Sequence, residues 1–438
     1  MTAKALILAA GAGTRMKSDK PKVVHEVLGK PLVRWVVDAA HDAGIEDVVT
    51  VLGHMSEKVA PFVEGDTKIA IQTQQLGTGD AVNAGREAFT QADGSIAEGS
   101  LVVLSGDCPL ITPETIQALI AKREETGAAV VVLTMHMDDP FGYGRIVREG
   151  EAVVRIVEQK DANNQEAAIT ECNSGFYCFD APALFDALSR VSNDNAQGEY
   201  YLTDVLEICR NDGREVLALQ TADAEEAMGV NSRVQLAQAT HAMQHRINNR
   251  HMMAGVTMWD PESTFIGPDV EIAQDVELWP QTYLLGTTKV GSHSVIGPNT
   301  RLTDTQVGCG ARVDETVAIE AQIDDAAECG PRAYLRPGTH LCEGAKAGTH
   351  VEIKKSTIGK GSKVPHLSYI GDTTMGENVN IGAGSITCNY DGVNKNHTEI
   401  GDNVFVGSDT MMVAPVNIGA GAIIGASSCI TRDVAPDA

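Results

Sequence analysis

The sequence predicts two fold classes joined in one chain: an α/β domain with a parallel sheet, followed by a parallel β-helix. Short aliphatic runs alternate with helical periodicity over residues 4–134, and one long helical segment follows later. After Phe265 an aliphatic residue returns at every sixth position. Strands alternating with helices are typical of a parallel sheet covered on both faces, and a period of six is typical of hexapeptide β-helices.

The α/β pattern starts close to the N-terminus. Apolar, β-branched runs predict strands at residues 4–10, 47–52, 68–71, 101–104 and 128–133. A helix is expected over residues 31–43, because proline stands at its first position and valines recur on one face. Thr112, Pro113 and Glu114 open another helix with a cap, a proline and an acid in order. Residues 144–220 are less regular and are assigned to the same domain as a lobe.

Residues 232–253 form the predicted linker, because they lack Pro and Gly and indicate one long helix where the composition changes. We therefore expect a first domain over residues 1–233, a linker helix over 234–254 and a repeat domain over 255–438.

The repeat domain carries two aliphatic runs with a period of six. They comprise Ile266, Ile272, Leu278, Leu284, Val290, Ile296 and Leu302, and then Ile400, Val406, Met412, Ile418, Ile424 and Ile430. We expect these side chains to point into a shaft; the alternative, a glycine-rich β-sandwich, does not have this period. Glycines such as Gly267 and Gly297 after the repeating residue suggest corners with positive φ. A polar insertion at 388–397 breaks the period, either as decoration or as part of a binding site.

Composition excludes several classes of partner. The 438 residues hold 34 Lys plus Arg against 59 Asp plus Glu, a formal charge of −25, which repels nucleic acid and anionic membranes. Nine cysteines without a Cys-x-x-Cys pair indicate free thiols in a reducing compartment and no zinc site. No signal peptide or membrane-spanning stretch is evident. We expect a soluble, cytoplasmic protein.

A glycine-rich loop follows the first predicted strand and includes Gly11, Gly13 and Arg15. Its N–H groups suit phosphate oxygens, and Lys22 delivers a cation toward it. Met16 stands where a dinucleotide-binding loop has its last glycine, and the Gly-Lys-Ser/Thr of a Walker loop is absent. Read alone, the segment fits an ordinary βα turn equally well.

With Pro21 and Lys22, this opening resembles the sugar-1-phosphate nucleotidyltransferases, and further motifs narrow the resemblance to the bifunctional GlmU family. These motifs keep the family's order at residues 75–79, 105–110, 142–145, 157–161, 173–175, 197–204 and 229–233. The resemblance implies an α/β Rossmann-like nucleotidyltransferase domain, a long linker helix and a left-handed parallel β-helix in a homotrimer, with acetyl sites between subunits.

The implied function is synthesis of UDP-N-acetylglucosamine. Acetyl-CoA first acetylates glucosamine-1-phosphate, and N-acetylglucosamine-1-phosphate then takes uridylyl from UTP with release of pyrophosphate, aided by Mg²⁺. The second reaction needs positioning and charge neutralisation rather than a protein nucleophile.

In the first domain the resemblance assigns roles residue by residue. Leu8, Ala9, Ala10 and Gly11 hold the nucleotide, Arg15 and Lys22 neutralise its phosphates, Gln72, Gly77 and Thr78 read uracil, Gly144, Glu158 and Asn173 hold the sugar, and Asp107 with Asn231 carries Mg²⁺. Hard oxygen ligands suit that metal. Read alone, Asp107 suits a turn, Glu158 a solvated surface and Asn231 a helix cap.

In the repeat domain His366 is the candidate general base, because acetylating an amine requires deprotonating an ammonium. Lys354 and Arg336 lie one and two coils earlier and supply cations for a sugar phosphate, although a lone histidine is more often structural. By the resemblance, the remaining members of the acetyl site are Tyr369 and Asn380 for glucosamine-1-phosphate, Asn389 and Tyr390 on the inserted loop, and Ala383, Ser408 and Ala426 for acetyl-CoA. Read alone, Ser408 suits a hydroxyl that caps a turn.

Two rival readings remain. In the first, only the nucleotidyltransferase is active and the β-helix is structural or regulatory, but such a β-helix has no need of Arg336, Lys354 and His366. In the second, the chain is a non-catalytic scaffold, which could have lost Lys22, Asp107 and Asn231, yet all three are present. Family members usually continue past the position of Ala438 into a tail that supplies a basic residue for acetyl-CoA. We therefore expect acetyl transfer by residues 1–438 to be weakened, and uridylyl transfer to be unaffected.

Overall fold

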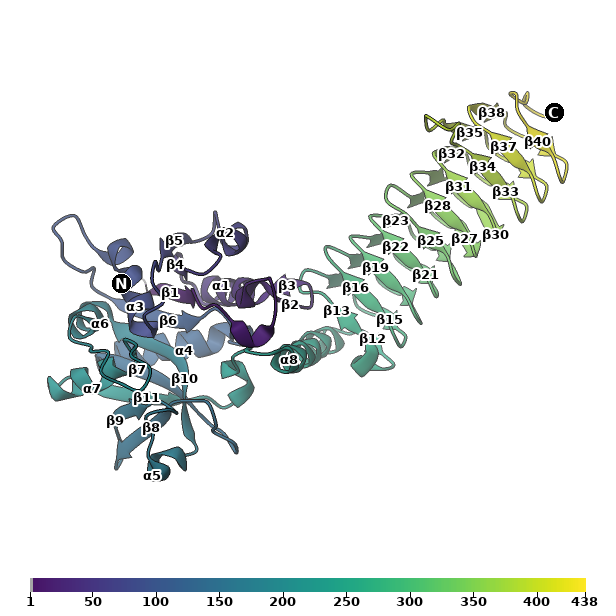
Figure 1. The fold of residues 1–438 in the computed structure, drawn as a ribbon. Helices are drawn as coiled ribbons and strands as arrows, with labels where there is room; N and C mark the ends of the chain where they lie inside the picture. Colours follow the sequence, from purple (N-terminus) through teal and green to yellow (C-terminus); the bar gives the residue numbers. More distant parts are fainter. Residues whose placement is uncertain (1–2) are drawn as a thin grey trace. The chain divides into compact units, whose positions relative to one another are not determined.

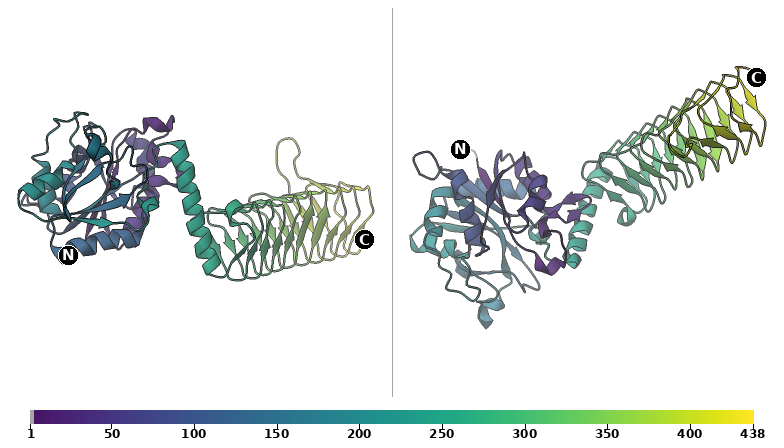
Figure 2. Two further views of the ribbon diagram at one scale, coloured as in Figure 1. Left: turned by 90° about the horizontal axis from the view of Figure 1, so that it is seen from below. Right: turned by 45° about the horizontal axis from the view of Figure 1, so that its top comes forward.

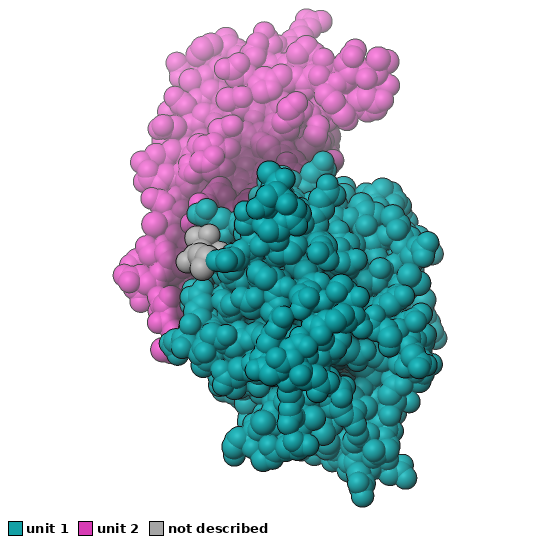
Figure 3. Space-filling model, turned by 90° about the vertical axis from the view of Figure 1, so that its left-hand side faces the viewer, with its two compact units in different colours: residues 1–243 teal, residues 244–438 magenta. Residues whose placement is uncertain are grey.

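The computed structural model describes residues 3–438 and divides the chain into two compact units, Met1–Met243 and Gln244–Ala438 (Figure 3). The division falls inside α8 (Arg233–Met253), the long helix predicted over residues 232–253. Among the described residues no helix is both long and apolar enough to cross a membrane.

The first unit is built on one sheet in which the path β11-β7-β10-β6-β1-β4-β5 is joined by β8 and β9 (Figure 1). The strands are β1 (Lys4–Ala9), β4 (Asp47–Leu52), β5 (Lys68–Ile71), β6 (Ser100–Ser105), β7 (Val130–His136), β8 (Arg145–Glu149), β9 (Ala152–Val157), β10 (Glu171–Asp180) and β11 (Val216–Gln220). All five predicted strands are present, as β1, β4, β5, β6 and β7.

The five predicted strands run parallel to one another, whereas β10, from the region that was assigned no strand, runs antiparallel to both β6 and β7. A parallel return needs a crossover, usually a helix. Between β7 and β10 the chain instead forms the antiparallel β8–β9 pair and the single-turn α5 (Asn164–Ala167). The region that looked irregular in the sequence therefore completes the sheet with β8–β11.

Helices flank this sheet. They are α1 (Leu32–Asp42), α2 (Ser56–Val59), α3 (Thr78–Ala84), α4 (Pro113–Thr126), α6 (Ala181–Leu188) and α7 (Asp204–Asn211), and a short β2 (Glu26–Val27) and β3 (Lys30–Pro31) hairpin precedes α1. The expected start of α4 is confirmed: the Thr112 hydroxyl accepts a hydrogen bond from the Thr115 backbone N–H at 3.3 Å. In α1, however, Pro31 is the cap residue just before the helix.

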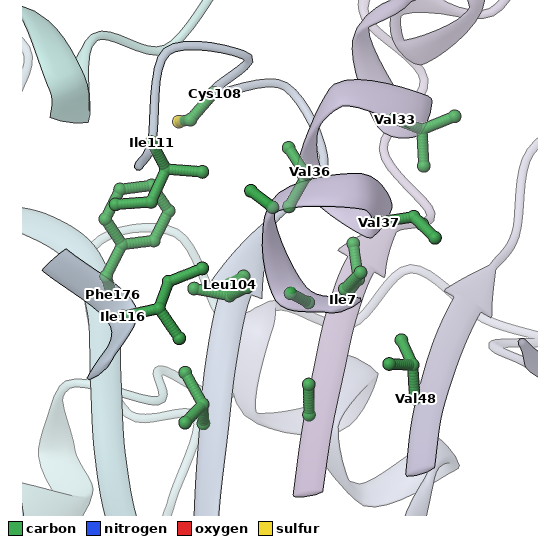
Figure 4. Packing of buried hydrophobic residues seen from close by; sticks show 14 of the residues in the cluster. Ile7, Val33, Val36, Val37, Val48, Leu104, Cys108, Ile111, Ile116 and Phe176 are labelled. Carbon is green, nitrogen blue, oxygen red and sulfur yellow. The ribbon is translucent and has the colours of Figure 1, made fainter. Parts of the chain in front are cut away.

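The core between α1 and the sheet fixes the ends of the central strands. Val33, Val36 and Val37 of α1 are fully buried and lie over Ile7 of β1 and Leu104 of β6 (Figure 4). Each such side chain contributes roughly 1.5–3 kcal/mol on burial. The loops that leave β1 and β6 therefore start from fixed points.

The second unit is a parallel β-helix with three faces, each a stack of short strands (Figures 1 and 2). The first face holds β12 (Thr257–Met258), β15 (Glu277–Leu278), β18 (Val295–Ile296), β21 (Arg312–Val313), β24 (Glu328–Cys329), β27 (Lys346–Thr349), β30 (Lys363–His366), β33 (Asn380–Ile381), β36 (Phe405–Val406) and β39 (Ile423–Ile424). The second holds β13 (Phe265–Ile266), β16 (Tyr283–Leu285), β19 (Arg301–Thr303), β22 (Val317–Ile319), β25 (Tyr334–Leu335), β28 (Glu352–Lys354), β31 (Tyr369–Gly371), β34 (Ile386–Cys388), β37 (Met411–Val413) and β40 (Cys429–Ile430). The third holds β14 (Glu271–Ile272), β17 (Lys289–Val290), β20 (Gln306–Val307), β23 (Gln322–Ile323), β26 (His340–Leu341), β29 (Thr357–Ile358), β32 (Thr373–Met375), β35 (Thr398–Ile400) and β38 (Val416–Ile418).

The period-six residues fill the shaft, as predicted. Ile266 pairs with Leu284 and Leu284 with Leu302, so three hexapeptides make one coil. Both runs are buried, apart from Ile272 and Ile430, which are half-buried.

The reason given for the glycines is only partly right. Gly297 has a φ of 105°, as expected, but Gly267 does not have a positive φ. Close approach of neighbouring coils is the commoner constraint: a Cβ on Gly291 would lie 2.6 Å from the carbonyl carbon of Gly308. The insertion at 388–397 leaves the β-helix as one loop between β34 and β35 (Figure 2, left).

Candidate active sites

The glycine-rich loop of the first unit follows β1, whose end is hydrogen-bonded to the residue just past β6. The Gly106 backbone N–H, just past β6, donates to the Leu8 carbonyl oxygen at 2.9 Å. Gly13 has a φ of 60°, and a Cβ there would lie 2.5 Å from the Cβ of Lys22. Glycine thus allows the Lys22 segment to cross directly over the loop, with Ala9, Ala10 and Gly11 beside it in the chain.

Four predicted residues from distant parts of the sequence meet beside this loop. Asn231 Oδ1 accepts hydrogen bonds from Arg15 Nη2 at 2.8 Å and from Lys22 Nζ at 3.0 Å, and Lys22 also pairs with Asp107. The backbone carbonyl of Asp107 accepts from the Val230 N–H at 2.9 Å, which joins the β6 loop to the 229–231 segment. One carboxylate oxygen and one amide oxygen therefore face the same cationic nitrogen.

The alternative reading of Asn231 as the cap of α8 is wrong. Ser232 takes that place, because its hydroxyl accepts from the Gln235 backbone N–H at 3.3 Å. The Asn231 side-chain oxygen is thereby left to Arg15 and Lys22.

The three predicted uracil-reading residues also lie together. The buried Gln72 amide donates to the Gly77 carbonyl at 3.2 Å and to Asp80 Oδ2 at 2.8 Å. Thr78, the first residue of α3, accepts the Leu202 backbone N–H through its hydroxyl at 3.0 Å. Gly77 has a φ of 116°, and a Cβ there would lie 2.6 Å from the carbonyl oxygen of Tyr200.

The predicted sugar-holding residues gather where β8 starts, where β9 ends and near the start of β10. The Gly144 carbonyl accepts the Asn173 backbone N–H at 2.9 Å, and a Cβ on Gly144 would lie 3.6 Å from Glu158 Oε1. Asn173 donates to the Tyr177 hydroxyl at 2.7 Å, and Glu158 accepts from Thr203 at 3.3 Å. Burial raises the pKa of Glu158, an effect that the Thr203 hydrogen bond partly offsets. Glu158 is therefore not the solvated surface acid of the alternative reading.

In the β-helix one group of predicted residues converges on a carboxylate. Asp372 Oδ2 accepts from Lys354 Nζ at 3.1 Å and from Asn389 Nδ2 at 2.5 Å, and Asn389 also lies 3.3 Å from the Tyr369 hydroxyl. Burial alone would raise the pKa of Asp372, but the hydrogen bonds of Lys354 and Asn389 and the Lys354 charge lower it.

Arg336 joins this group from the preceding coil. Leu335 pairs with Ile353, so Arg336 stands beside Lys354 on the stack, and its guanidinium donates to Glu352 Oε1 at 2.9 Å. Both predicted phosphate-binding cations therefore sit on one edge of the second face.

His366 and the predicted acetyl-CoA contacts lie on the other side of a corner. His366 is exposed, and its ring makes no hydrogen bond to any residue between 3 and 438. On successive coils, Lys363 pairs with Asn380, Asn380 with Phe405 and Phe405 with Ile423. Three positions further along each coil, the same stacking forms a column of His366, Ala383, Ser408 and Ala426. The corner at Leu367, with a φ of 46°, separates this column from Tyr369.

Tyr390 stays with its own loop. Its hydroxyl donates to the Gly392 carbonyl at 2.5 Å, and Lys395 lies 4.0 Å from the centroid of its ring. Within one chain the predicted acetyl-site residues thus fall into the Asp372 group, the His366 column and the loop tip, with Asn380 in β33 on the same face as the column.

Some side chains that contact the predicted residues escaped the sequence reading, among them Asp80, Thr203, Glu352 and Asp372. Asp372 could have been suspected, since it follows the repeat residue of its coil and stands one coil beyond Lys354. The other three carry no signal that separates them from ordinary polar residues.

Comparisons with known proteins agree with both patterns. Residues 5–207 match a family model described as MobA-like NTP transferase domain, and residues 397–432 match one described as bacterial transferase hexapeptide. The chain is similar to "Bifunctional protein GlmU" of Syntrophomonas wolfei, with 48% identity over 100% of this chain and 96% of that protein. A protein of the same name from Streptomyces coelicolor is 51% identical over 99% of this chain and 90% of its own length.

These relatives span both units and the helix between them. The resemblance stated from the motifs is therefore confirmed, as is the fold class of a Rossmann-like nucleotidyltransferase followed by a left-handed parallel β-helix of hexapeptide repeats. The chain belongs to the bifunctional GlmU family, and it combines the uridylyltransferase and the glucosamine-1-phosphate acetyltransferase that together make UDP-N-acetylglucosamine.

Proposed function

We propose that the uridylyl transfer is carried out by the cluster of Arg15, Lys22, Asp107 and Asn231. The observation that carries this proposal is the convergence of two cations and two side-chain oxygens beside a glycine-rich loop. A phosphate oxygen of N-acetylglucosamine-1-phosphate attacks the α-phosphorus of UTP, and the bond to pyrophosphate breaks. Arg15 and Lys22 neutralise the charge that the leaving pyrophosphate gathers.

The donor set fits Mg²⁺. Asp107 Oδ2 and Asn231 Oδ1 face one cation already, the Lys22 ammonium, and both are hard oxygens of the kind that Mg²⁺ prefers. These two residues would hold the metal, which supplies charge neutralisation at the phosphates. Lys22 then turns from Asp107 to the phosphates.

Recognition of the two substrates uses the remaining residues of the first unit. The Gln72 amide, oriented by Asp80, reads the uracil edge together with Gly77 and Thr78. Glu158 and Asn173 bind hydroxyl and amide groups of the sugar, and Gly144 leaves room for its ring.

For acetyl transfer we propose His366 as the general base. His366 takes a proton from the ammonium of glucosamine-1-phosphate, the amine attacks the thioester carbonyl, and coenzyme A leaves as the thiol after protonation. Arg336 and Lys354 bind the sugar phosphate, Tyr369, Asn380, Asn389 and Tyr390 line the sugar site, and Ala383, Ser408 and Ala426 contact acetyl-CoA. The ring of His366 is exposed and has no hydrogen-bond partner among residues 3–438, which suits this role.

We further propose a cytoplasmic homotrimer with each acetyl site between subunits. Its support is the split of the acetyl-site residues around the corner at Leu367, because a neighbouring chain can bring a second group against the first. UTP, acetyl-CoA and the two sugar phosphates are the expected small-molecule partners.

Mass spectrometry of products tests both activities. One reaction contains Mg²⁺, UTP and N-acetylglucosamine-1-phosphate, and the other contains Mg²⁺, UTP, glucosamine-1-phosphate and acetyl-CoA. We expect UDP-N-acetylglucosamine in both, and none in either after chelation of Mg²⁺. Product only in the first reaction would favour the rival with a structural β-helix, and light scattering of the same sample tests the trimer.

A further inference from the structure

Asp324, His340 and Cys342 form a third group of reactive side chains, on the third face of the β-helix and outside both sites. One donor atom from each residue lies within 4.8 Å of the others, and all three side chains are half-buried. They come from two adjacent coils, since Gln322 pairs with His340 and Ile323 with Leu341.

The donor atoms point at one place. His340 Nε2 lies 2.8 Å from Asp324 Oδ2 and 3.9 Å from Cys342 Sγ. Tetrahedral zinc with bonds of about 2.0–2.3 Å holds its ligand atoms roughly 3.3–3.8 Å apart, so small side-chain rotations suffice. Gln322 donates to the other carboxylate oxygen, Asp324 Oδ1, at 2.9 Å and orients Oδ2 toward the histidine.

The place of these residues in the stack is unusual. The registers put one position of each coil in a column. That column begins with Ala273, ends with Ala435 and holds Gly291, Gly308, Gly359, Gly376, Gly401 and Gly419 between them. Asp324 and Cys342 occupy the same column on the two coils between Gly308 and Gly359. The other coils have glycine at this position, or alanine at the two ends of the stack, whereas these two coils carry metal-ligand side chains next to each other, with a histidine beside them.

The surroundings favour a cation. A surface hollow beside the group is lined by Asp324, Asp325 and Glu343, of which Glu343 is paired with Lys360 at 2.8 Å.

We propose that Asp324, His340 and Cys342 bind a Zn²⁺-class transition-metal ion that ties two neighbouring coils together. On binding, the metal–sulfur bond forms as the thiol proton leaves to solvent, and His340 offers the Nε2 lone pair with its proton on Nδ1. A water completes the tetrahedron. Thiolate and imidazole select zinc or cobalt over Mg²⁺, so this site differs in chemistry from the oxygen-donor site of Asp107 and Asn231.

The sequence predicted no zinc site, because it lacks a Cys-x-x-Cys pair. Asp324 and His340 are 16 positions apart and meet only through stacking of the coils. Spacing rules drawn from zinc fingers do not cover such a site.

Titration of the chelator-treated full chain with Co²⁺ alone tests the proposal. We expect a thiolate-to-cobalt charge-transfer band in the near ultraviolet that saturates at one equivalent and is bleached by Zn²⁺ but not by Mg²⁺. Cys342→Ser should abolish the band, and His340→Gln should weaken cobalt binding at least about tenfold. Cys309→Ser, at an exposed cysteine of the same unit, is the matched control and should keep the band.

A second measurement guards against a folding artefact. Zn²⁺ should raise the melting temperature of the wild-type β-helix and of Cys309→Ser, but not that of Cys342→Ser. Absence of the band in wild type overturns the proposal, as does a band that survives in Cys342→Ser and is lost in Cys309→Ser.

Discussion

In the first unit Arg15 and Asn231 meet across 216 positions of sequence, whereas in the β-helix Lys354 and Asp372 meet across 18, the length of one coil. The first contact depends on a whole sheet, since strands and loops from both ends of the unit must be in place. The second depends on the register between two neighbouring coils. Side chains of the α/β unit are therefore coupled globally and those of the β-helix locally.

The largest expected effect separates the two reactions. His366→Ala removes the proposed base and should slow acetyl transfer by about 100-fold to 10,000-fold, a range typical of general-base loss. Uridylyl transfer, assayed with N-acetylglucosamine-1-phosphate, should stay at the wild-type rate. Steady-state kinetics of each half-reaction give the answer, and His350→Ala, one coil away from the column, serves as the control.

Asp107→Asn should produce the opposite pattern. Loss of the charged oxygen weakens Mg²⁺ binding and frees Lys22, and a fall of about 100-fold to 1,000-fold in the uridylyl kcat is expected. Acetyl transfer should be unchanged. If raising Mg²⁺ to saturation restored the full rate, Asp107 would act in metal affinity alone, and the proposed charge arrangement would be wrong.

Truncating one buried leucine in each unit tests whether the destabilisation spreads through the whole unit or stays near the substitution. Leu104→Ala in β6 and Leu302→Ala in β19 each remove a fully buried side chain and should each cost about 2–5 kcal/mol of unfolding free energy. Hydrogen exchange should rise throughout the first unit for Leu104→Ala. For Leu302→Ala the rise should centre on β16, β19 and β22, because a coil contacts only its neighbours. If hydrogen exchange rose over an equally wide region in both variants, the difference between global and local coupling would be refuted.

The smallest expected effect depends on pH. The folded-state pKa of Asp372 lies below its ordinary value of 3.8. This carboxylate thus contributes stability above that value, and the contribution disappears as pH falls through the lowered folded-state pKa. Asp372→Asn should therefore melt below wild type at neutral pH by a few degrees at most, with a gap that closes in acid. If the difference in melting temperature stayed constant as the pH fell below the folded-state pKa of Asp372, the destabilisation would come from altered packing and not from the lost charge.

The features that could be predicted from the sequence are mainly those that depend on local stacking, and the features that could not are those that depend on the whole sheet. Period-six residues such as Leu284 reveal both strand position and inward direction, so the β-helix could be predicted in detail. The reversed direction of β10 could not, because it depends on what lies between β7 and β10 rather than on local pattern. Asp107 and Asn231 were chosen by resemblance, and no spacing rule would have paired them. Asp80 was missed because it meets its partner, Gln72, only where the chain turns into α3, and no sequence pattern marks that contact.

Stacking by whole coils also governs how the β-helix tolerates changes in length. Each coil offers nearly the same two surfaces to its neighbours, so removal or duplication of an 18-residue unit such as 266–283 would rejoin matching edges. Coils of 17 and 16 residues already occur, since Lys289 pairs with Gln306 and Arg301 with Val317, so the loss of one or two residues falls at a corner and leaves the aliphatic residues in the shaft. Length variation in this half should therefore come as complete turns, as one or two residues at a corner, or as loops that leave the β-helix, as residues 389–397 do.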